Sequence, residues 1–122
     1  MSQTWSNKFR VAVGGLLWAL RDQTSFHVHL AFTAAVITLA VLLRLQLWQW
    51  IGLVFAIGLV LAAELFNTAM ELLVAVLHPE YDPRIGRALD VAAAAVLVSA
   101  LTAATIGIAI LGPELYRWLM QV

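Results

Sequence analysis

Three long apolar runs follow one another along the chain, separated by short polar segments. They cover about residues 28–47, about residues 48–77 and about residues 84–111, and the apolar part of the third begins at Asp90. About 20 consecutive apolar residues suffice for an α-helix to cross the hydrocarbon core of a bilayer. The pattern therefore predicts an all-α membrane protein, with three transmembrane helices in a single domain that covers residues 1–122.

A different pattern precedes the first run, over about residues 4–21. Apolar side chains recur there at steps of three and four residues, and the basic side chains fall largely outside that stripe. This spacing gives a helix one apolar face, and such helices lie at the boundary between headgroups and acyl chains. We therefore expect an amphipathic surface helix. Its apolar positions are Trp5, Phe9, Ala12, Val13, Leu16, Leu17 and Leu20.

Proline, glycine and capping residues mark where these helices should begin and end. Asp22–Ser25 offers a turn and an N-cap before the first span. Pro79 should stop the second helix, and Asp82 followed by Pro83 has the pattern of an N-cap with proline at the first helical position. Gly112–Pro113 is typical of a helix stop, so we expect the third span to end at Leu111.

Composition excludes several classes of function. The chain is 63% hydrophobic and 11% charged, whereas ordinary globular domains are about 45–50% apolar and about 25% charged. Its net charge is zero, so nothing favours a nucleic-acid partner. Cysteine is absent, which excludes disulfides and thiolate metal sites. We identify no cleaved signal peptide, because no short apolar run with a small-residue cleavage site follows the N-terminus closely.

The basic residues predict an orientation. Five of the seven lie before the first span or between the second and third spans. Because cytoplasmic loops carry the excess of lysine and arginine, we expect the N-terminus inside and the C-terminus outside. The five are Lys8, Arg10, Arg21, Arg84 and Arg87, and the other two are Arg44 and Arg117.

Two carboxylates and an amide interrupt the second apolar run. Asn67 lies about 60° from Glu64 around a helix and Glu71 only about 20° from it, so all three side chains project from one face. A charged side chain at the bilayer centre costs about 2.5–3.5 kcal/mol on insertion scales. Intramembrane ionisable residues are therefore functional-site candidates by default.

Each of these residues also has a purely structural interpretation. Glu64 would then be a protonated carboxyl between packed helices, Asn67 an interhelical hydrogen-bonding residue and Glu71 a solvated residue near a helix end. Asp90 would be a first-turn residue favoured by the helix dipole. His27 and His29 have no third ligand at metal spacing, so we interpret them as interfacial residues. Three unrelated structural roles on one helix face are less probable than a single functional site.

These residues carry a resemblance to the small integral-membrane kinases of bacteria that phosphorylate diacylglycerol or undecaprenol. The family's signature matches Glu64-Leu65-Phe66-Asn67-Thr68-Ala69-Met70-Glu71. The match continues through Pro79-Glu80-Tyr81 and Gly86-Arg87-Ala88-x-Asp90. Upstream it covers Phe9-x-x-Ala12-x-x-Gly15-Leu16-x-x-Ala19 and Ser25-Phe26-x-Val28-His29. The resemblance implies a homotrimer in the bacterial inner (plasma) membrane, with a surface helix and three spans per subunit. Its active sites lie at the cytoplasmic interface and are shared between subunits.

The resemblance also implies an ATP-dependent lipid kinase with Mg²⁺ as its metal, and it assigns roles to individual residues. Glu64 resembles the general base that accepts the proton of the lipid hydroxyl. Glu71 resembles a ligand of the nucleotide-bound Mg²⁺, and Gln23 stands where the family usually has a second metal-binding glutamate. Asn67, Glu80, Tyr81 and Asp90 correspond to residues on the nucleotide side. Phe9 and Trp18, together with Glu64, are expected to contact the lipid alcohol.

Two departures from the family pattern leave alternatives open. Gln23 offers a carbonyl oxygen without negative charge, and Leu89 stands where the family usually has a lysine, so it contributes no phosphate contact. The chain could accordingly be a divergent, non-catalytic or altered-substrate relative that serves as a lipid-binding or regulatory subunit. A proton or cation conductor is the third alternative. A conductor needs polar side chains along most of the bilayer depth, whereas the outer part of each span is apolar.

Overall fold

Four α-helices account for most of the chain in a computed structural model that describes residues 4–121. They are α1 (Trp5–Asp22), α2 (Thr24–Leu42), α3 (Leu47–Leu77) and α4 (Pro83–Met120). Of these, α2, α3 and α4 are long and apolar enough to cross a membrane. The predicted all-α architecture with three membrane-length helices is therefore confirmed. The ends of the expected domain, residues 1–3 and 122, lie outside the described residues.

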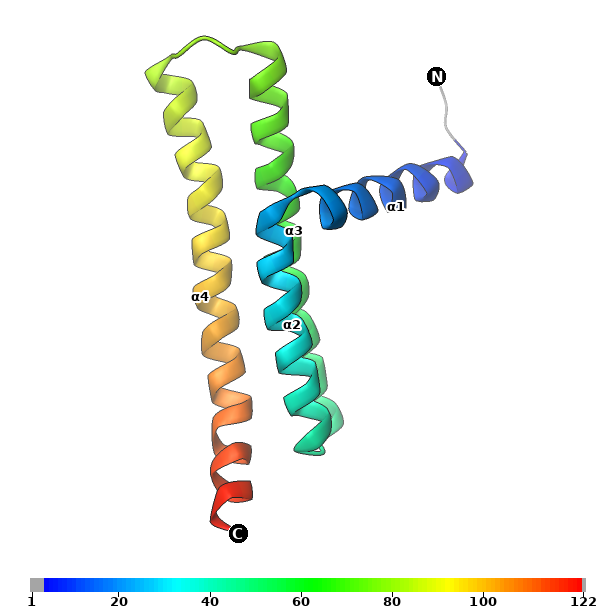
Figure 1. The fold of residues 1–122 in the computed structure, drawn as a ribbon, viewed down its shortest axis with the longest axis vertical. Helices are drawn as coiled ribbons and strands as arrows, with labels where there is room; N and C mark the ends of the chain where they lie inside the picture. The colour runs from blue at the N-terminus through cyan, green and yellow to red at the C-terminus, as the bar shows by residue number, and fades with distance from the viewer. Residues whose placement is uncertain (1–3, 122) are drawn as a thin grey trace.

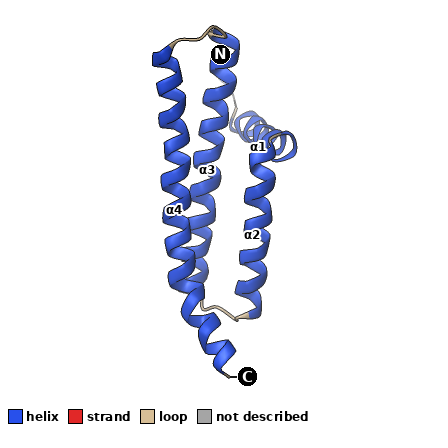
Figure 2. Ribbon diagram, turned by 60° about the vertical axis from the view of Figure 1, so that its left-hand side comes forward, coloured by secondary structure: helices blue, strands red, loops and turns tan. Residues whose placement is uncertain are grey.

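The three long helices run side by side, and α1 crosses them at a large angle (Figure 1). α3 packs mainly against α4, with which it forms a long antiparallel hairpin, and α2 packs more lightly on α3. The α3–α4 connection lies at one end of this bundle, which we call the loop end, and the C-terminus lies at the other (Figure 2). At the loop end, α3 and α4 extend beyond the level of α1 (Figure 1).

α2 ends at Leu42, five residues before the predicted end of the first span. Arg44 has φ 56°, which is the left-handed conformation that terminates many helices. The Arg44 N–H donates to the Val41 carbonyl at 3.2 Å, and the Leu45 N–H donates to the Ala40 carbonyl at 3.4 Å. These two bonds satisfy carbonyls that the helix end would otherwise leave open. The chain therefore reverses direction here.

α4 continues through Pro113 to Met120, so the predicted helix stop at Leu111 is wrong. Proline in a helix interior lacks one hydrogen-bond donor and usually bends the helix. The last turns of α4 bend away from the axis of the rest of the helix (Figure 2). Two side-chain contacts hold this extension: Glu114 accepts from Gln49 of α3 at 3.0 Å and from Arg117 at 2.6 Å. These contacts offset the cost of the proline.

α3 and α4 approach each other closely at Gly52. A Cβ atom added there would lie 2.7 Å from Cδ1 of Ile110, so the two helices pack directly on each other at this point. Ile110 belongs to a small buried cluster with Ala40 and Leu53, near the C-terminal end of the bundle. Small residues permit such close packing between helices in lipid.

Gly52 and Gly58 provide a matched test of this packing, because both lie within α3 and only Gly52 meets a neighbour. Gly58→Ala should stabilise the protein by up to about 1 kcal/mol, since glycine is a poor helix former. Gly52→Ala should lose that gain, because the Ile110 side chain must move. A double variant that combines Gly52→Ala with Ile110→Val, which removes Cδ1, should recover part of this gain in stability. Thermal unfolding in detergent, followed by circular dichroism, measures all three; equal stabilisation by the two alanines would contradict this packing.

Candidate active site

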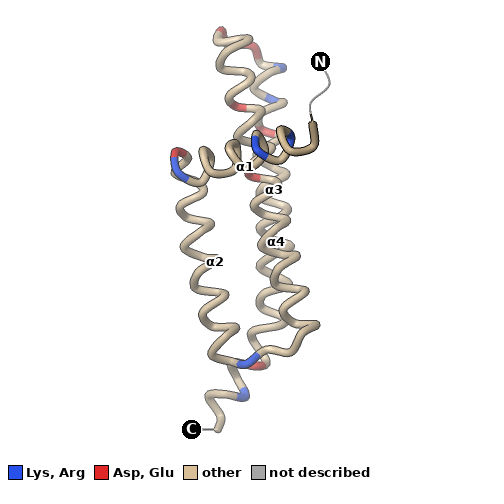
Figure 3. Tube along the Cα trace, turned by 90° about the vertical axis from the view of Figure 1, so that its right-hand side faces the viewer, with Lys and Arg blue, Asp and Glu red and all other residues tan. Residues whose placement is uncertain are grey.

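α1 crosses α3 at the level of the acidic face predicted from the sequence. A shallow cavity of about 340 Å³ lies between the two helices, and α3 contributes Leu65, Thr68, Ala69 and Leu72 to its walls. Glu64, Asn67 and Glu71 interleave with these positions on the same two turns. The charged side chains are concentrated from this level to the loop end, and few lie along the rest of the bundle (Figure 3). The acidic face therefore lies where the apolar bundle meets its polar end.

Glu64 is buried and paired. Its residue is only 6% exposed, and its Oε2 atom lies 3.5 Å from Nε2 of His29, near the start of α2. A buried carboxylate without a partner would be costly, and this contact offsets part of that cost. The sequence interpretation of His29 as an interfacial residue missed the pairing. One signal was present, because a short turn between two antiparallel helices places the start of α2 beside the middle of α3, where Glu64 lies.

Asn67 and Glu71 lie together, as their spacing predicts. The Asn67 amide donates to Oε1 of Glu71 at 3.0 Å, which fixes the exposed carboxylate against the helix. The other polar atom of Asn67, Oδ1, is buried and has no hydrogen-bond partner within residues 4–121. Most buried polar side-chain atoms are hydrogen-bonded, so this free acceptor is an exception.

The remaining predicted site residues lie on other elements than α3. Glu80 and Tyr81 are exposed in the α3–α4 connection, Asp90 is exposed on α4, and Gln23 is half-buried between α1 and α2. In the described chain none of these four side chains is hydrogen-bonded or ion-paired with Glu64, Asn67 or Glu71. On α1, Trp18 contributes to the α1–α3 cavity, whereas Phe9 is exposed and lies outside the cavity wall.

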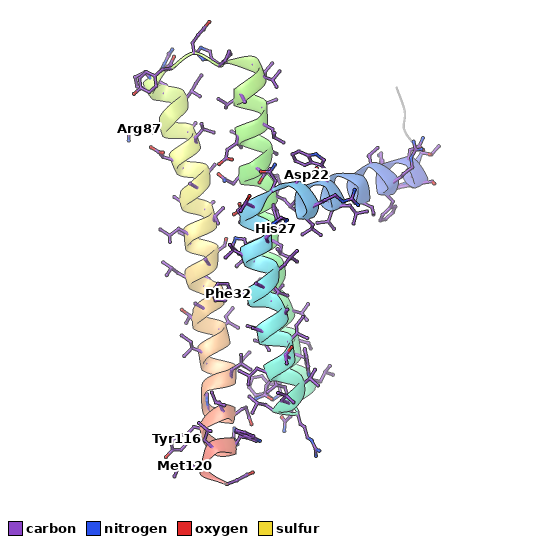
Figure 4. The ribbon with its side chains drawn as sticks, viewed as in Figure 1. Asp22, His27, Phe32, Arg87, Tyr116 and Met120 are labelled. Atoms are coloured by element: carbon purple, nitrogen blue, oxygen red, sulfur yellow. The ribbon has the colours of Figure 1, made fainter. Side chains whose placement is uncertain are left out.

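An apolar groove of about 620 Å³ runs between α2, α3 and α4. It begins beside His29, close to the Glu64 carboxylate, and reaches Leu115 near the C-terminal end. Phe32 extends from α2 towards α4 along this groove (Figure 4). Nearly all of its lining is aliphatic or aromatic, so the groove suits a hydrocarbon chain, and its one ionisable lining residue is His29.

The start of α4 carries the polar groups of the loop end. The Asp82 carboxylate caps the helix by accepting from the Arg84 backbone N–H at 2.8 Å and from its Nη2 at 3.0 Å, which confirms the predicted N-cap. The hydrogen bond from the Arg84 side chain holds the pKa of Asp82 below its usual value. The cap is consequently present at neutral pH and is lost only as the pH falls through that lowered pKa. Arg87 follows one turn later on α4 (Figure 4).

No group of three or more histidine, aspartate or glutamate side chains within residues 4–121 is arranged to hold a metal ion. An all-protein metal cage is therefore not part of this bundle. Mg²⁺, however, is usually bound through one or two carboxylates together with substrate phosphates and water. Glu71, beside the free oxygen of Asn67, has the chemistry for that kind of shared site.

Comparisons with known proteins agree with this arrangement. Residues 10–111 match the family described as prokaryotic diacylglycerol kinase. The undecaprenol kinase of Bacillus subtilis (strain 168) is 33% identical over 106 residues, which are 86% of each chain. The diacylglycerol kinase of Synechocystis sp. (strain ATCC 27184 / PCC 6803 / Kazusa) is 37% identical over 108 residues, 88% of this chain but 62% of that protein.

No solved structure matches the chain. Both relatives are named as lipid kinases, so they do not favour the non-catalytic alternative. The family match spans the acidic face, the α3–α4 connection and most of the three long helices. The chain belongs to the prokaryotic diacylglycerol kinase family, which places it among the membrane lipid kinases.

Proposed function

We propose that the protein transfers the γ-phosphoryl group of ATP to the hydroxyl of a membrane-resident lipid alcohol, with diacylglycerol and undecaprenol as the two candidate substrates. One observation carries this proposal: a buried carboxylate in contact with His29 stands at the end of a long apolar groove. A lipid tail in the groove would bring its hydroxyl to Glu64. The polar loop end of α3 and α4 lies just beyond, where a nucleotide in water can reach the same point.

In this proposal Glu64 acts as the general base. The carboxylate accepts the proton of the lipid hydroxyl while the hydroxyl oxygen attacks the γ-phosphorus, and ADP leaves with the bridging oxygen. Phosphoryl transfer depends mostly on positioning and on electrostatic stabilisation. The apolar groove supports positioning, because a tail held along the bundle restricts where the hydroxyl lies.

Glu71, Asn67 and Gln23 fit a Mg²⁺ ion that arrives with ATP. Glu71 offers an exposed carboxylate, Asn67 a buried and unpartnered amide oxygen, and Gln23 a neutral carbonyl oxygen. Bound Mg²⁺ would neutralise charge on the phosphates. We propose that Glu80, Tyr81 and Asp90 contact the nucleotide, since all three are exposed beyond the level of α1.

A homotrimer in the bacterial inner membrane accommodates these positions. Within residues 4–121, Gln23 and Asp90 form no hydrogen bond or ion pair with Glu64, Asn67 or Glu71, and we propose that a neighbouring subunit helps to complete the site. The large apolar side chains left exposed on α2, α3 and α4, including Phe32, Phe55 and Ile108, provide surface for subunit and lipid contacts. We propose that α1 lies on the cytoplasmic surface and that the C-terminus lies outside.

Replacing the base tests the chemistry. Glu64→Gln keeps the shape and the hydrogen-bonding capacity of the side chain but removes its basicity. Turnover should fall by about 10²–10⁴-fold, while the affinity for Mg·ATP stays close to that of the parent. The assay is transfer of labelled phosphate to lipid alcohols in bicelles, with nucleotide binding measured in parallel. A variant that phosphorylates lipid as fast as the parent would remove Glu64 from the chemistry.

The metal site is tested by two opposite charge changes. Glu71→Gln should weaken Mg·ATP binding and should be partly rescued by more Mg²⁺, because a ligand charge is lost. Gln23→Glu adds a carboxylate and should tighten metal binding without abolishing turnover. Titration of activity and of nucleotide binding against Mg²⁺ measures both variants. If Glu71→Gln leaves the Mg²⁺ dependence unchanged, the metal is bound elsewhere.

The orientation is tested with single cysteines, which the native chain lacks. An impermeant maleimide should label Asp82→Cys in sealed inverted vesicles and should fail to label it in intact spheroplasts. Gln121→Cys should give the opposite pattern, because the two residues lie at opposite ends of the bundle. Labelling of both cysteines from the same side would contradict the three-span arrangement.

A further inference from the structure

The three histidines of the chain differ in what they contact. His27 lies 3.1 Å from the carbonyl oxygen of Arg21, and His78 lies 2.9 Å from that of Glu80, so both contact backbone close in sequence. His29 instead faces a side chain on another helix, with its Nε2 atom 3.5 Å from Oε2 of Glu64. Its side chain is 23% exposed and that of Glu64 is 8% exposed. His29 is the histidine that reaches the proposed base.

This contact decides how the Glu64 carboxylate is held. Within residues 4–121, His29 is the only side chain that forms an ion pair or hydrogen bond with Glu64. A glutamate side chain has three rotatable bonds, and burial with a single partner leaves that partner to select its orientation. Because Oε2 faces the imidazole, Oε1 remains as the oxygen without a partner. Oε1 is the atom available to a hydroxyl.

His29 also belongs to the wall of the apolar groove, next to Val28 and Phe32. The same ring therefore contacts the carboxylate and borders the path of a lipid tail. We propose that His29 is a positioning residue for Glu64, which keeps the carboxylate turned towards the hydroxyl of a lipid alcohol at the end of the groove. This proposal rests on the proposed lipid kinase function and adds to it a role for His29, which lies outside the Glu64–Glu71 signature.

The proposed phosphoryl transfer moves one proton. The lipid hydroxyl gives its proton to Oε1 of Glu64, its oxygen forms the new bond to the γ-phosphorus of ATP, and ADP leaves with the electrons of the broken phosphoanhydride bond. His29 keeps its own proton throughout. We assign that proton to Nε2, because the atom facing a carboxylate oxygen must be the donor. A separation of 3.5 Å exceeds the usual hydrogen-bond length, and catalytic hydrogen bonds often shorten only when substrate binds.

The first test compares a variant that lacks a donor with one that retains it. His29→Leu keeps the groove filled and apolar but removes the N–H group, whereas His29→Gln places an amide N–H at a similar reach. The kcat of His29→Leu should fall by about 10–100-fold, the effect expected when a reacting group is misplaced by about 1 Å. KM for Mg·ATP should stay unchanged, and His29→Gln should recover most of the kcat. His27→Leu is the matched control and should retain the parent activity.

A double-mutant cycle separates positioning from a general structural role. In a Glu64→Gln background His29→Leu should cause little further loss, since the group that it positions no longer acts as a base. A fold defect would lower the residual activity by the same factor in both backgrounds, and that result would overturn the proposal. Full activity of His29→Leu in the parent background would also overturn it, while leaving the kinase function intact.

The contact has a readout besides activity. In protein labelled with ¹⁵N-histidine, Glu64→Gln should move the ring-nitrogen signal of His29 and leave those of His27 and His78 in place. An unmoved His29 signal would overturn the positioning role. If the parent protein phosphorylates none of the lipid alcohols, the proposed kinase function fails and the positioning role fails with it. The parent assay therefore separates failure of the function from failure of His29.

Discussion

A carboxylate buried in an apolar, membrane-length helix requires a partner, and the rest of the site depends on how this chain meets that requirement. Glu64 is enclosed between α2 and α3, and His29 is the side chain that pairs with it. The pairing is possible because α2 and α3 are antiparallel and joined by a short turn, which brings the start of α2 beside the middle of α3. Because the buried Glu64 carboxylate needs a partner, the site depends on how α2 and α3 are arranged.

Glu64 lies at the level where the apolar part of the bundle meets its polar end. The apolar groove begins beside His29 and extends towards the C-terminal end, while Asn67 and Glu71 offer polar oxygens about one and two turns towards the loop end. α1 crosses α3 at this same level. The two substrates of a lipid kinase differ completely in solubility, so a site between an apolar groove and a polar end can admit each from its own side.

The sequence predicted the features that depend on the length and spacing of its apolar runs. The second span was expected at 48–77 and α3 covers Leu47–Leu77, because a continuous apolar run followed by Pro79 leaves little choice of boundary. Features that depend on a local conformation or on a tertiary contact were missed. The end of α2 depends on the positive φ of Arg44, which no hydrophobic pattern reveals. Pro113 was interpreted as a stop because the bond between Glu114 and Gln49 joins residues far apart in sequence.

The contacts of the candidate site likewise include one that the sequence predicted and one that it did not. One-helix geometry predicted the contact between Asn67 and Glu71, whereas the partner of Glu64 comes from another helix and was not recognised. Gln23 and Asp90 were grouped with the site through the family resemblance, and within residues 4–121 neither forms a hydrogen bond or ion pair with Glu64, Asn67 or Glu71.

The central claim is that the acceptor hydroxyl reaches Glu64 from the bilayer through the apolar groove. The most direct measurement compares acceptors that carry the same hydroxyl chemistry but differ in their tails. Protein in bicelles would be incubated with γ-labelled ATP and Mg²⁺, with either a long-chain diacylglycerol or undecaprenol, or with glycerol or a short water-soluble prenol. The account predicts labelled phosphate on at least one long-chain alcohol and none on the water-soluble analogues. Equal phosphorylation of the water-soluble alcohols would contradict it.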